Sequence, residues 1–338
     1  MNKLYTVIII MIILLLSGCA MISKEEAQMR EDAGQLTKVQ FYVPSENEDK
    51  ISIIDIQQSQ PVGTIDTGEK PTNLVFDSTM RTAYVANQNS GTIGVINSQT
   101  LEQESEIEVG PLPHGLVLSN DNKTLYVATV GDQFIDVIDT EKQEVVNRID
   151  LGENARSNYP LLSGDKLYIT DHENDRVYVI DTESQSVIDT IETGQTPRVL
   201  RSNTDGTKLY VAASQSNQVE VYDALSYEQL SIIKLNGNAT DVVISEDESI
   251  AVVSELETNQ VEIVDLQTSE VIKTIPDLAG AKHLSFNRKE TKAYVTLSGT
   301  NEVAVIDMET EELVERIKVG DAPHGIEIKA LPGIGGSC

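Results

Sequence analysis

The chain has 338 residues, of which 54 are acidic and 25 are basic, and its formal net charge at pH 7 is −29. A surface of this charge repels phosphate backbones, so the composition argues against nucleic acid as a partner. The only cysteines are Cys19 and Cys338, one near each end of the chain, which excludes a disulfide framework as the source of stability.

The amino terminus has the pattern of an export signal. Lys3 precedes an apolar run, residues 5–16, which is too short to span a bilayer comfortably and is typical of the central part of a signal peptide. The run ends in Leu16-Ser17-Gly18-Cys19, which resembles the lipobox of bacterial lipoproteins. This resemblance implies cleavage after Gly18 and a lipid on Cys19. An ordinary secretory peptide that happens to contain a cysteine is the alternative.

We therefore predict a signal peptide at residues 1–18, and a lipidated cysteine with a solvated tether at residues 19–36. Several acyl chains hold a protein on a bilayer far more firmly than one chain does. The expected location is the extracytoplasmic face of a bacterial cell membrane, to which the lipid attaches the protein.

From residue 37 onward the sequence repeats itself every 42 residues. A tyrosine recurs at this step in most copies: Tyr42, Tyr84, Tyr126, Tyr168, Tyr210 and Tyr294. An aspartate, or once an asparagine, recurs in every copy: Asp55, Asn97, Asp139, Asp181, Asp223, Asp265 and Asp307. A fixed period of this length indicates a closed ring or an array of like units rather than a mosaic of domains.

Each copy predicts four short strands. Residues 51, 53 and 54 and their counterparts form columns of Ile, Val and, once, Tyr, so both faces of this strand are expected to be buried. A sheet covered on both faces by similar sheets is a propeller blade. A loop with recurring glycine and proline, such as Gly110 and Pro113, leads to the fourth strand, which is the innermost strand of a propeller.

The order of the strands predicts how the ring closes. The repeats begin on the second strand of a blade and end on a first strand, so residues 325–329 should pair with residues 39–43. The predicted fold is all-β, a seven-bladed β-propeller of four-stranded antiparallel blades over residues 37–330, closed by pairing of the C-terminal strand with the N-terminal strands. Closure leaves no long free edge. Residues 331–338 are expected to form a flexible tail.

The segments YVPS, YVAN, YVAT, YITD, YVAA and YVTL, each followed by a strand that ends in Asp or Asn, resemble the YVTN-repeat β-propellers. The absence of tryptophan excludes the WD signature. The resemblance implies a seven-bladed fold but no single function, because similar propellers include binding lipoproteins, lactonase-like enzymes and the propellers of haem and copper enzymes.

Ligands of propellers usually collect over the mouth of the channel, where the loops into the innermost strands lie. The residue after the proline position should be closest to that mouth. The predicted ligand-binding residues are this column and one neighbouring histidine: Thr72, His114, Arg156, Arg198, Thr240, Lys282, His324 and His283. Three of them are permanent cations in an acidic chain, which indicates an anion site, and the histidines should strengthen it below about pH 6.5.

Two alternatives to this anion site stay open. The basic residues could be solvated, or they could be partners for acids such as Asp241 and Glu327. The short turn at residues 163–165 also leaves open whether Arg156 shares the column with the others.

The sequence favours a non-catalytic, monomeric binding or scaffold module for a small anion, a peptide or a partner protein. No cofactor is predicted, and a metal held by His114, His283 and His324 is kept as an alternative. The functional alternative is a lactonase-like or other hydrolase, or an enzyme that handles a metal or a tetrapyrrole, on the same face. The acidic residues 171, 173 and 175 lack the glycine that a calcium loop requires.

Overall fold

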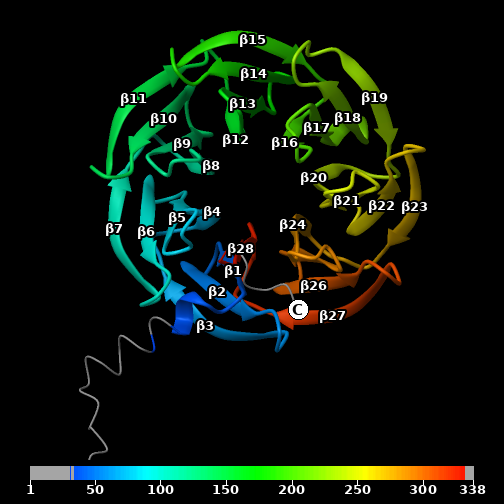
Figure 1. Cartoon of the computed structure of the whole chain (residues 1–338), viewed down its shortest axis with the longest axis horizontal. Coiled ribbons are helices and arrows are strands. Elements are labelled where there is room, and N and C mark those ends of the chain that lie inside the picture. The colour runs from blue at the N-terminus through cyan, green and yellow to red at the C-terminus, as the bar shows by residue number, and fades with distance from the viewer. Residues whose placement is uncertain (1–30, 32–33, 332–338) are drawn as a thin grey trace, which may run out of the picture.

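The computed structural model describes residue 31 and residues 34–331. Over these residues the chain forms a ring of seven four-stranded antiparallel sheets, so the predicted seven-bladed propeller is confirmed (Figure 1). The predicted signal peptide, Cys19 and residues 332–338 of the predicted tail lie outside the described residues. Within the described ranges, no helix has the length and apolar character that crossing a membrane requires.

Each blade runs from an innermost strand at the channel to an outermost strand at the rim (Figure 1). The innermost strands are β4 (Pro71–Phe76), β8 (Pro113–Leu118), β12 (Ser157–Ser163), β16 (Pro197–Ser202), β20 (Ala239–Ile244), β24 (Ala281–Phe286) and β28 (Glu327–Lys329). The second strands are β1 (Gln40–Ser45), β5 (Thr82–Asn87), β9 (Thr124–Thr129), β13 (Lys166–Asp171), β17 (Lys208–Ala213), β21 (Ile250–Glu255) and β25 (Lys292–Leu297).

The third and outermost strands complete the blades. The third strands are β2 (Lys50–Asp55), β6 (Thr92–Asn97), β10 (Phe134–Asp139), β14 (Arg176–Asp181), β18 (Gln218–Asp223), β22 (Gln260–Asp265) and β26 (Glu302–Asp307). The outermost strands are β3 (Gln60–Asp66), β7 (Glu102–Glu108), β11 (Glu144–Asp150), β15 (Ser186–Glu192), β19 (Gln229–Lys234), β23 (Glu270–Ile275) and β27 (Glu312–Lys318). A short 3-10 turn, η1 (Ser214–Ser216), follows β17.

The ring is closed by strands from the two ends of the described chain. β28 pairs antiparallel with β1, and Lys329 lies opposite Gln40. The predicted closure is therefore confirmed, with a closing strand of three residues. Lys329 is fully buried, and its ammonium donates a hydrogen bond of 2.5 Å to the carbonyl oxygen of Gln35. The end of the predicted tether thus packs against the closing blade.

Apolar side chains fill the junctions between the blades. Seven clusters each join two neighbouring blades. At the closing junction the ring of Phe41 in β1 contacts that of Tyr294 in β25, with centroids 4.4 Å apart. Ile53 and Ile54, neighbours on opposite faces of β2, are both completely buried. The expectation that both faces of this strand are covered is confirmed.

The fourth blade departs from the 42-residue step. In the third blade Pro113 of β8 lies opposite Thr129 of β9. In the fourth blade Ser157 of β12 lies opposite Asp171 of β13, and it stands two residues later in the chain than the step predicts. The cause is the short turn at residues 163–165, which joins β12 to β13. Each residue at the start of β12 therefore lies where the 42-residue step would place the residue two positions earlier in the chain.

The second and third strands of the sixth blade, β21 and β22, hold two buried carboxylates. Glu255 and Glu262 have no exposed surface. Glu262 accepts a hydrogen bond from the backbone N–H of Asn236, whereas one oxygen of Glu255 has no hydrogen-bond partner among the described residues. Burial, aided by the neighbouring charge of Glu262, raises the pKa of Glu255 to about 7.

We expect Glu255→Gln to stabilise the protein at pH 8 and not at pH 4. The folded-state pKa of Glu255 lies above the unfolded-state value, so its contribution to stability is complete below about pH 4.5 and is lost as the pH rises through about 7. The amide stays neutral, and the free energy of unfolding at pH 8 should rise by about 1 to 2 kcal/mol.

Urea denaturation at both pH values measures this effect. The control is Glu257→Gln, which changes an exposed glutamate in the following loop and should alter stability little at either pH. Equal effects of Glu255→Gln at pH 4 and pH 8 would show that Glu255 is ionised normally in the folded protein.

Candidate functional site

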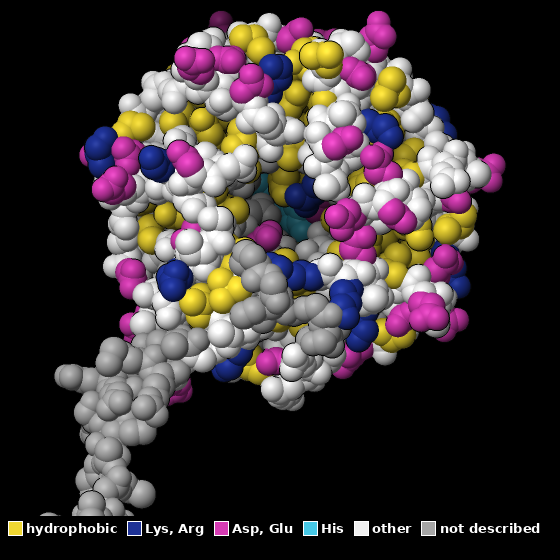
Figure 2. All heavy atoms as spheres, in the orientation of Figure 1, with side chains coloured by type: hydrophobic (Ala, Val, Ile, Leu, Met, Phe, Trp, Pro, Cys, Tyr) yellow, Lys and Arg dark blue, Asp and Glu magenta, His cyan; other side chains and the backbone are white. Residues whose placement is uncertain are grey.

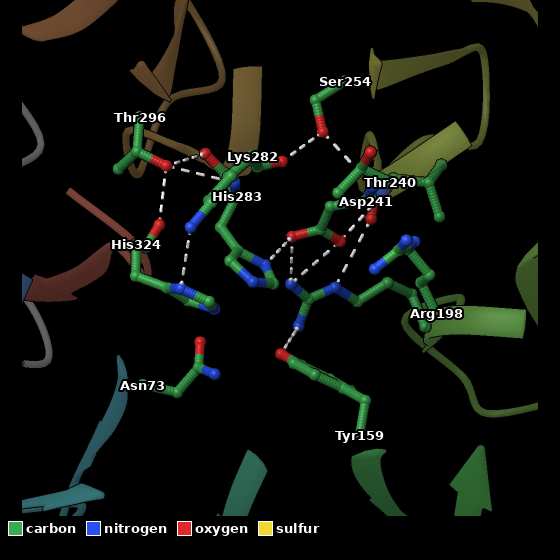
Figure 3. A network of polar contacts seen from close by, with 12 residues as sticks. Asn73, Tyr159, Arg198, Thr240, Asp241, Ser254, Lys282, His283, Thr296 and His324 are labelled. Carbon is green, nitrogen blue, oxygen red and sulfur yellow. Dashed lines mark hydrogen bonds and ion pairs between the residues drawn. The ribbon is translucent and has the colours of Figure 1, made fainter. Parts of the chain in front are cut away.

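A recess opens at the mouth of the central channel, where the inner strands begin (Figure 3). Its cavity volume is about 70 Å³, with further space that is open to solvent. Its walls come from the starts of five inner strands, from the segment before β28 and from the loop after β21. The lining residues are His114, Asn158, Arg198, Val199, Thr240, Leu256, Lys282, His283 and His324. Histidine side chains are visible inside the central opening of the ring (Figure 2).

The structure brings six of the eight predicted residues to this recess. These six are His114, Arg198, Thr240, Lys282, His283 and His324. Thr72 is buried and donates its hydroxyl to the carbonyl oxygen of His114 at 3.3 Å, so it has a structural role. Arg156 does not line the recess, and its Nε lies 3.9 Å from a carboxylate oxygen of Glu173. Because of the displacement in β12, Asn158 takes the position expected for Arg156.

Lys282 is paired with an acid that comes from the closing blade. Its ammonium lies 2.6 Å from Oε1 of Glu46, in the loop between β1 and β2. The same oxygen lies 2.6 Å from Nδ1 of His324. Burial alone would raise the pKa of Glu46, but His324 and Lys282 outweigh it and hold this pKa well below its usual range. The positive charge of Lys282 is therefore balanced within the protein.

A second acid, Asp241, is fully engaged below the recess (Figure 3). It is completely buried, and Nη2 of Arg201 lies 3.2 and 3.0 Å from its two oxygens. Nδ1 of His283 lies 2.9 Å from Oδ2. Burial would raise the pKa of Asp241, but Arg201 and His283 lower it. Arg201 also donates to the phenol oxygen of Tyr159 at 2.6 Å. The charges of Arg201 and Asp241 therefore offset each other.

Two histidines of the recess, His114 and His324, are held neutral. Nε2 of His114 and Nε2 of His324 face each other at 3.1 Å. Burial, aided by His283 and Lys282, lowers the pKa of His114 to about 3. Burial likewise holds the pKa of His324 well below 6.5, although Glu46 acts in the opposite direction. The expectation that these two histidines add positive charge below about pH 6.5 is therefore wrong, because removal from water disfavours the imidazolium.

Arg198 is the cation of the recess whose charge is not balanced nearby. Its side chain is half-buried, and its guanidinium has neither a hydrogen bond nor an ion pair with any of the residues that the structure describes. Its backbone carbonyl oxygen accepts hydrogen bonds from the side chains of Asn158 and Thr170, both at 3.0 Å. These bonds fix the backbone of Arg198 in place. His172, in the loop after β13, has a pKa lowered by burial and by the charge of Arg198.

Sequence reasoning missed several residues of this site. Glu46 could have been found, because it stands three 42-residue steps before His172, in the same kind of loop. Asn158 was hidden by the shortened turn of the fourth blade. Arg201 and Tyr159 stand further along the inner strands β16 and β12 than the predicted column, and no local pattern indicates that they form a network with Asp241.

The recess therefore combines one unbalanced cation with the neutral rings of His114 and His324. His283 donates Nδ1–H to Asp241, because a carboxylate can only accept. Over residues 34–331, no group of three or more His, Cys, Asp or Glu side chains could hold a metal ion. The arrangement as it stands is suited to binding a small anion.

Comparison with known proteins agrees with this fold. The sequence profile of a family described as "YNCE-like beta-propeller" matches residues 11–331. No curated protein matches the chain.

Three solved structures show the same architecture at low identity. The periplasmic gluconolactonase PpgL of Pseudomonas aeruginosa is 18% identical, with a TM-score of 0.75 over 88% of this chain and 100% of that chain. A functionally unknown protein of Desulfotomaculum acetoxidans is 16% identical, with a TM-score of 0.75 over 86% and 99%. Hydrazine synthase of Kuenenia stuttgartiensis is 19% identical, with a TM-score of 0.70 over 75% and 88%. At these identities the likeness shows the fold alone.

We expect Glu46→Gln to lower the free energy of unfolding by about 2 kcal/mol, because it leaves the ammonium of Lys282 without a carboxylate in a mostly buried setting. Glu46→Gln combined with Lys282→Met should cost less than the sum of the two single substitutions. Urea denaturation of the four proteins in a double-mutant cycle measures the coupling. Glu48→Gln, in the exposed part of the same loop, is the control, and strictly additive effects would contradict the pairing.

Proposed function

The chain belongs to the YNCE-like β-propeller family, and from that premise we propose that it is a lipid-anchored binding protein that holds a small carboxylate in the recess at the channel mouth. The observation that carries this proposal is Arg198. A half-buried guanidinium with no partner among the described residues is costly unless a ligand supplies the missing charge. A carboxylate matches a guanidinium with two parallel hydrogen bonds.

The charges of the recess favour a monoanion. Lys282 is offset by Glu46, and Arg201 is offset by Asp241. His114 and His324 are neutral because burial lowers the pKa of each ring. Only the charge of Arg198 is left for a ligand among the described lining residues. A carboxylate therefore balances the recess, whereas a phosphate dianion would bring a charge in excess.

The size of the recess supports a very small ligand. A cavity volume of about 70 Å³ is well below the range for drug-sized ligands, roughly 300 to 1,000 Å³. The hydroxyl oxygen of Thr240 accepts from the backbone N–H of Leu256 at 3.0 Å, which leaves its proton for a ligand oxygen. Val199 and Leu256 supply the apolar part of the wall.

Hydrolysis of a lactone is a second candidate. The solved structure of a periplasmic gluconolactonase shares the fold, and His283, with Nδ1 fixed by Asp241 at 2.9 Å, has the orientation of a general base. Against this role, Arg201 neutralises Asp241 and so weakens its support for an imidazolium. Gluconolactone added to the protein distinguishes the two candidates, since an enzyme consumes it and a binding protein does not.

The membrane location is part of the same proposal. Its support is the sequence Leu16-Ser17-Gly18-Cys19 after an apolar run, which lies outside the described residues. A lipid on Cys19 would hold the propeller at the extracytoplasmic face of a bacterial membrane, within reach of ligands outside the cytoplasm. The acidic charge of the chain suits a soluble body next to such a surface.

We expect Arg198→Gln to weaken binding of gluconate and acetate roughly tenfold or more, because it removes a charged bidentate contact. The measurement is the shift of the thermal unfolding midpoint of the full chain in detergent, at low ionic strength, with gluconate, acetate or inorganic phosphate. Without an anion, the variant should be at least as stable as the native protein, since it removes an unpaired charge.

Arg81→Gln is the matched control, because Arg81 is an exposed arginine away from the recess. It should leave every anion-induced shift unchanged. The proposal is wrong if neither carboxylate stabilises the native protein, or if Arg198→Gln keeps the stabilisation.

We expect Cys19→Ala to abolish lipid attachment. In a bacterial host the native chain should be found in the membrane fraction with the added mass of the lipid, and the variant should lack that mass and retain its signal segment. Cys338→Ala, at the other end, should behave like the native chain. An unmodified native chain, free in the culture medium, would contradict the anchor and leave the anion site untouched.

A further inference from the structure

The outer edge of the fifth blade carries more exposed apolar side chains than its place in the repeat accounts for. Its outermost strand, β19, lies at the rim of the ring (Figure 1). Leu225, in the turn before β19, is 87% exposed, and Leu230 and Ile232 on the strand are 53% and 39% exposed. Because the chain repeats every 42 residues, each of these positions can be compared with its counterparts in the six other blades.

The comparison shows that two of the three side chains are apolar in this blade alone. Leu230 is not distinctive, since Val146 and Ile188 are its counterparts in two other blades. The counterparts of Leu225 are Gln57, Gln99, Glu141, Glu183, Gln267 and Glu309. The counterparts of Ile232 are Thr64, Glu106, Arg148, Thr190, Thr274 and Arg316. The rim is therefore polar at both positions in the six other blades, and clustered apolar residues on a surface mark an interaction site.

β19 also differs from the other outermost strands in charge. Of the seven outermost strands that the structure describes, it alone contains no Asp or Glu. It pairs with β18 along one edge, and over the described residues no strand is bonded to its other edge. Charged residues on an edge strand discourage pairing with a strand of another molecule. β19 has Lys234 at one end only, so its free edge is the least protected.

We propose that two copies of this chain associate through β19, with the two strands side by side and antiparallel about a twofold axis at Ser231. This arrangement places Leu230 of one copy opposite Ile232 of the other, and it does so twice. It also brings Glu228 to Lys234 at both ends of the pair. Apolar pairs and opposite charges stabilise antiparallel strands, and a twofold interface uses the same surface on both molecules.

The same self-pairing is unfavourable for other outermost strands. β27 also begins and ends with opposite charges, Glu312 and Lys318, but a pair centred on Glu315 would set this glutamate against its own counterpart. β7 (Glu102–Glu108) has a glutamate at every second position. Like charges directly opposite each other destabilise an antiparallel pair, so β19 is better suited to self-pairing than either of these strands.

The charge of the whole chain sets the conditions for association. Each copy has a net charge of −29, which opposes contact at low salt, whereas charges more than ~8 Å apart are largely screened at physiological ionic strength. One strand and one turn from each copy make a small interface. We therefore expect a dissociation constant in the roughly micromolar range and weaker association at low salt. The monomer that the sequence favours is then the form present at low concentration.

The first test is sedimentation equilibrium of the full chain in density-matched detergent, at physiological ionic strength and roughly 1 to 100 µM. Leu225→Gln and Ile232→Thr introduce the residues that other blades carry, and each should raise the dissociation constant roughly tenfold. Val314→Thr is the matched control, because Val314 is a half-exposed valine on β27. It should leave association unchanged. The thermal unfolding midpoint of each variant at low concentration verifies that the propeller is folded.

The second test is a disulfide at the twofold axis. Opposite residues of an antiparallel pair have Cα atoms ~4.5 to 5.5 Å apart, which a disulfide can bridge. Ser231→Cys should therefore form a covalent dimer under mild oxidation. Ser105→Cys is the matched control, since Ser105 stands at the equivalent position of β7. Cys338 is replaced by serine in both chains, and a thiol reagent verifies that both new thiols are accessible.

The outcomes are independent of the anion site. Arg198→Gln should associate like the native chain. The proposal is wrong if the native chain stays monomeric up to ~100 µM, or if Ser231→Cys forms no more covalent dimer than Ser105→Cys. If Ser231→Cys is instead joined to a different protein in the membranes of the host, β19 binds that protein and association of two copies is overturned.

Discussion

The closing of the ring is the constraint on which this molecule depends. Each blade buries its two faces against the blades on either side, so all seven apolar junctions form only when the last strand meets the first. β28 does so with three residues beside β1. Phe41 and Tyr294 pack across the closing junction, and Glu46 joins Lys282 across it. The same closure that completes the core brings the starts of the inner strands together around one mouth.

That convergence explains how an acidic protein can hold a cationic recess. The net charge of −29 is spread over the whole chain, whereas most of the residues that line the recess stand at one position of the repeat. Most of the charges at this mouth are offset by ion pairs between side chains of different blades. The charge of Arg198 is not offset in this way. An unpaired charge lowers the stability of the fold, and such a cost is typical of a site that binds a ligand.

The repeat also shows how equivalent positions take different roles. Thr72 and His114 stand at equivalent positions in neighbouring blades. Thr72 is buried and donates a hydrogen bond to a backbone carbonyl oxygen, whereas His114 lines the recess. Similarly, Asp241 and His283 stand one repeat apart and bond to each other. The period supplies a scaffold of nearly constant geometry, and departures from it, such as the shortened turn that places Asn158 at the mouth, give the site its asymmetry.

The sequence by itself determined the number of blades, their strands, the closing pair and most of the residues around the mouth, because a 42-residue step repeats the same local pattern of apolar and turn residues. Only the tertiary structure decided which charges are offset by a partner and which histidine ring nitrogens lie in contact. Glu46 and His324 are 278 residues apart, and His114 and His324 are 210 apart, so no local pattern records their contact. Burial reversed the expected charge of His114 and His324, and a turn shortened by two residues moved Arg156 out of the site, because both effects depend on how neighbouring blades pack.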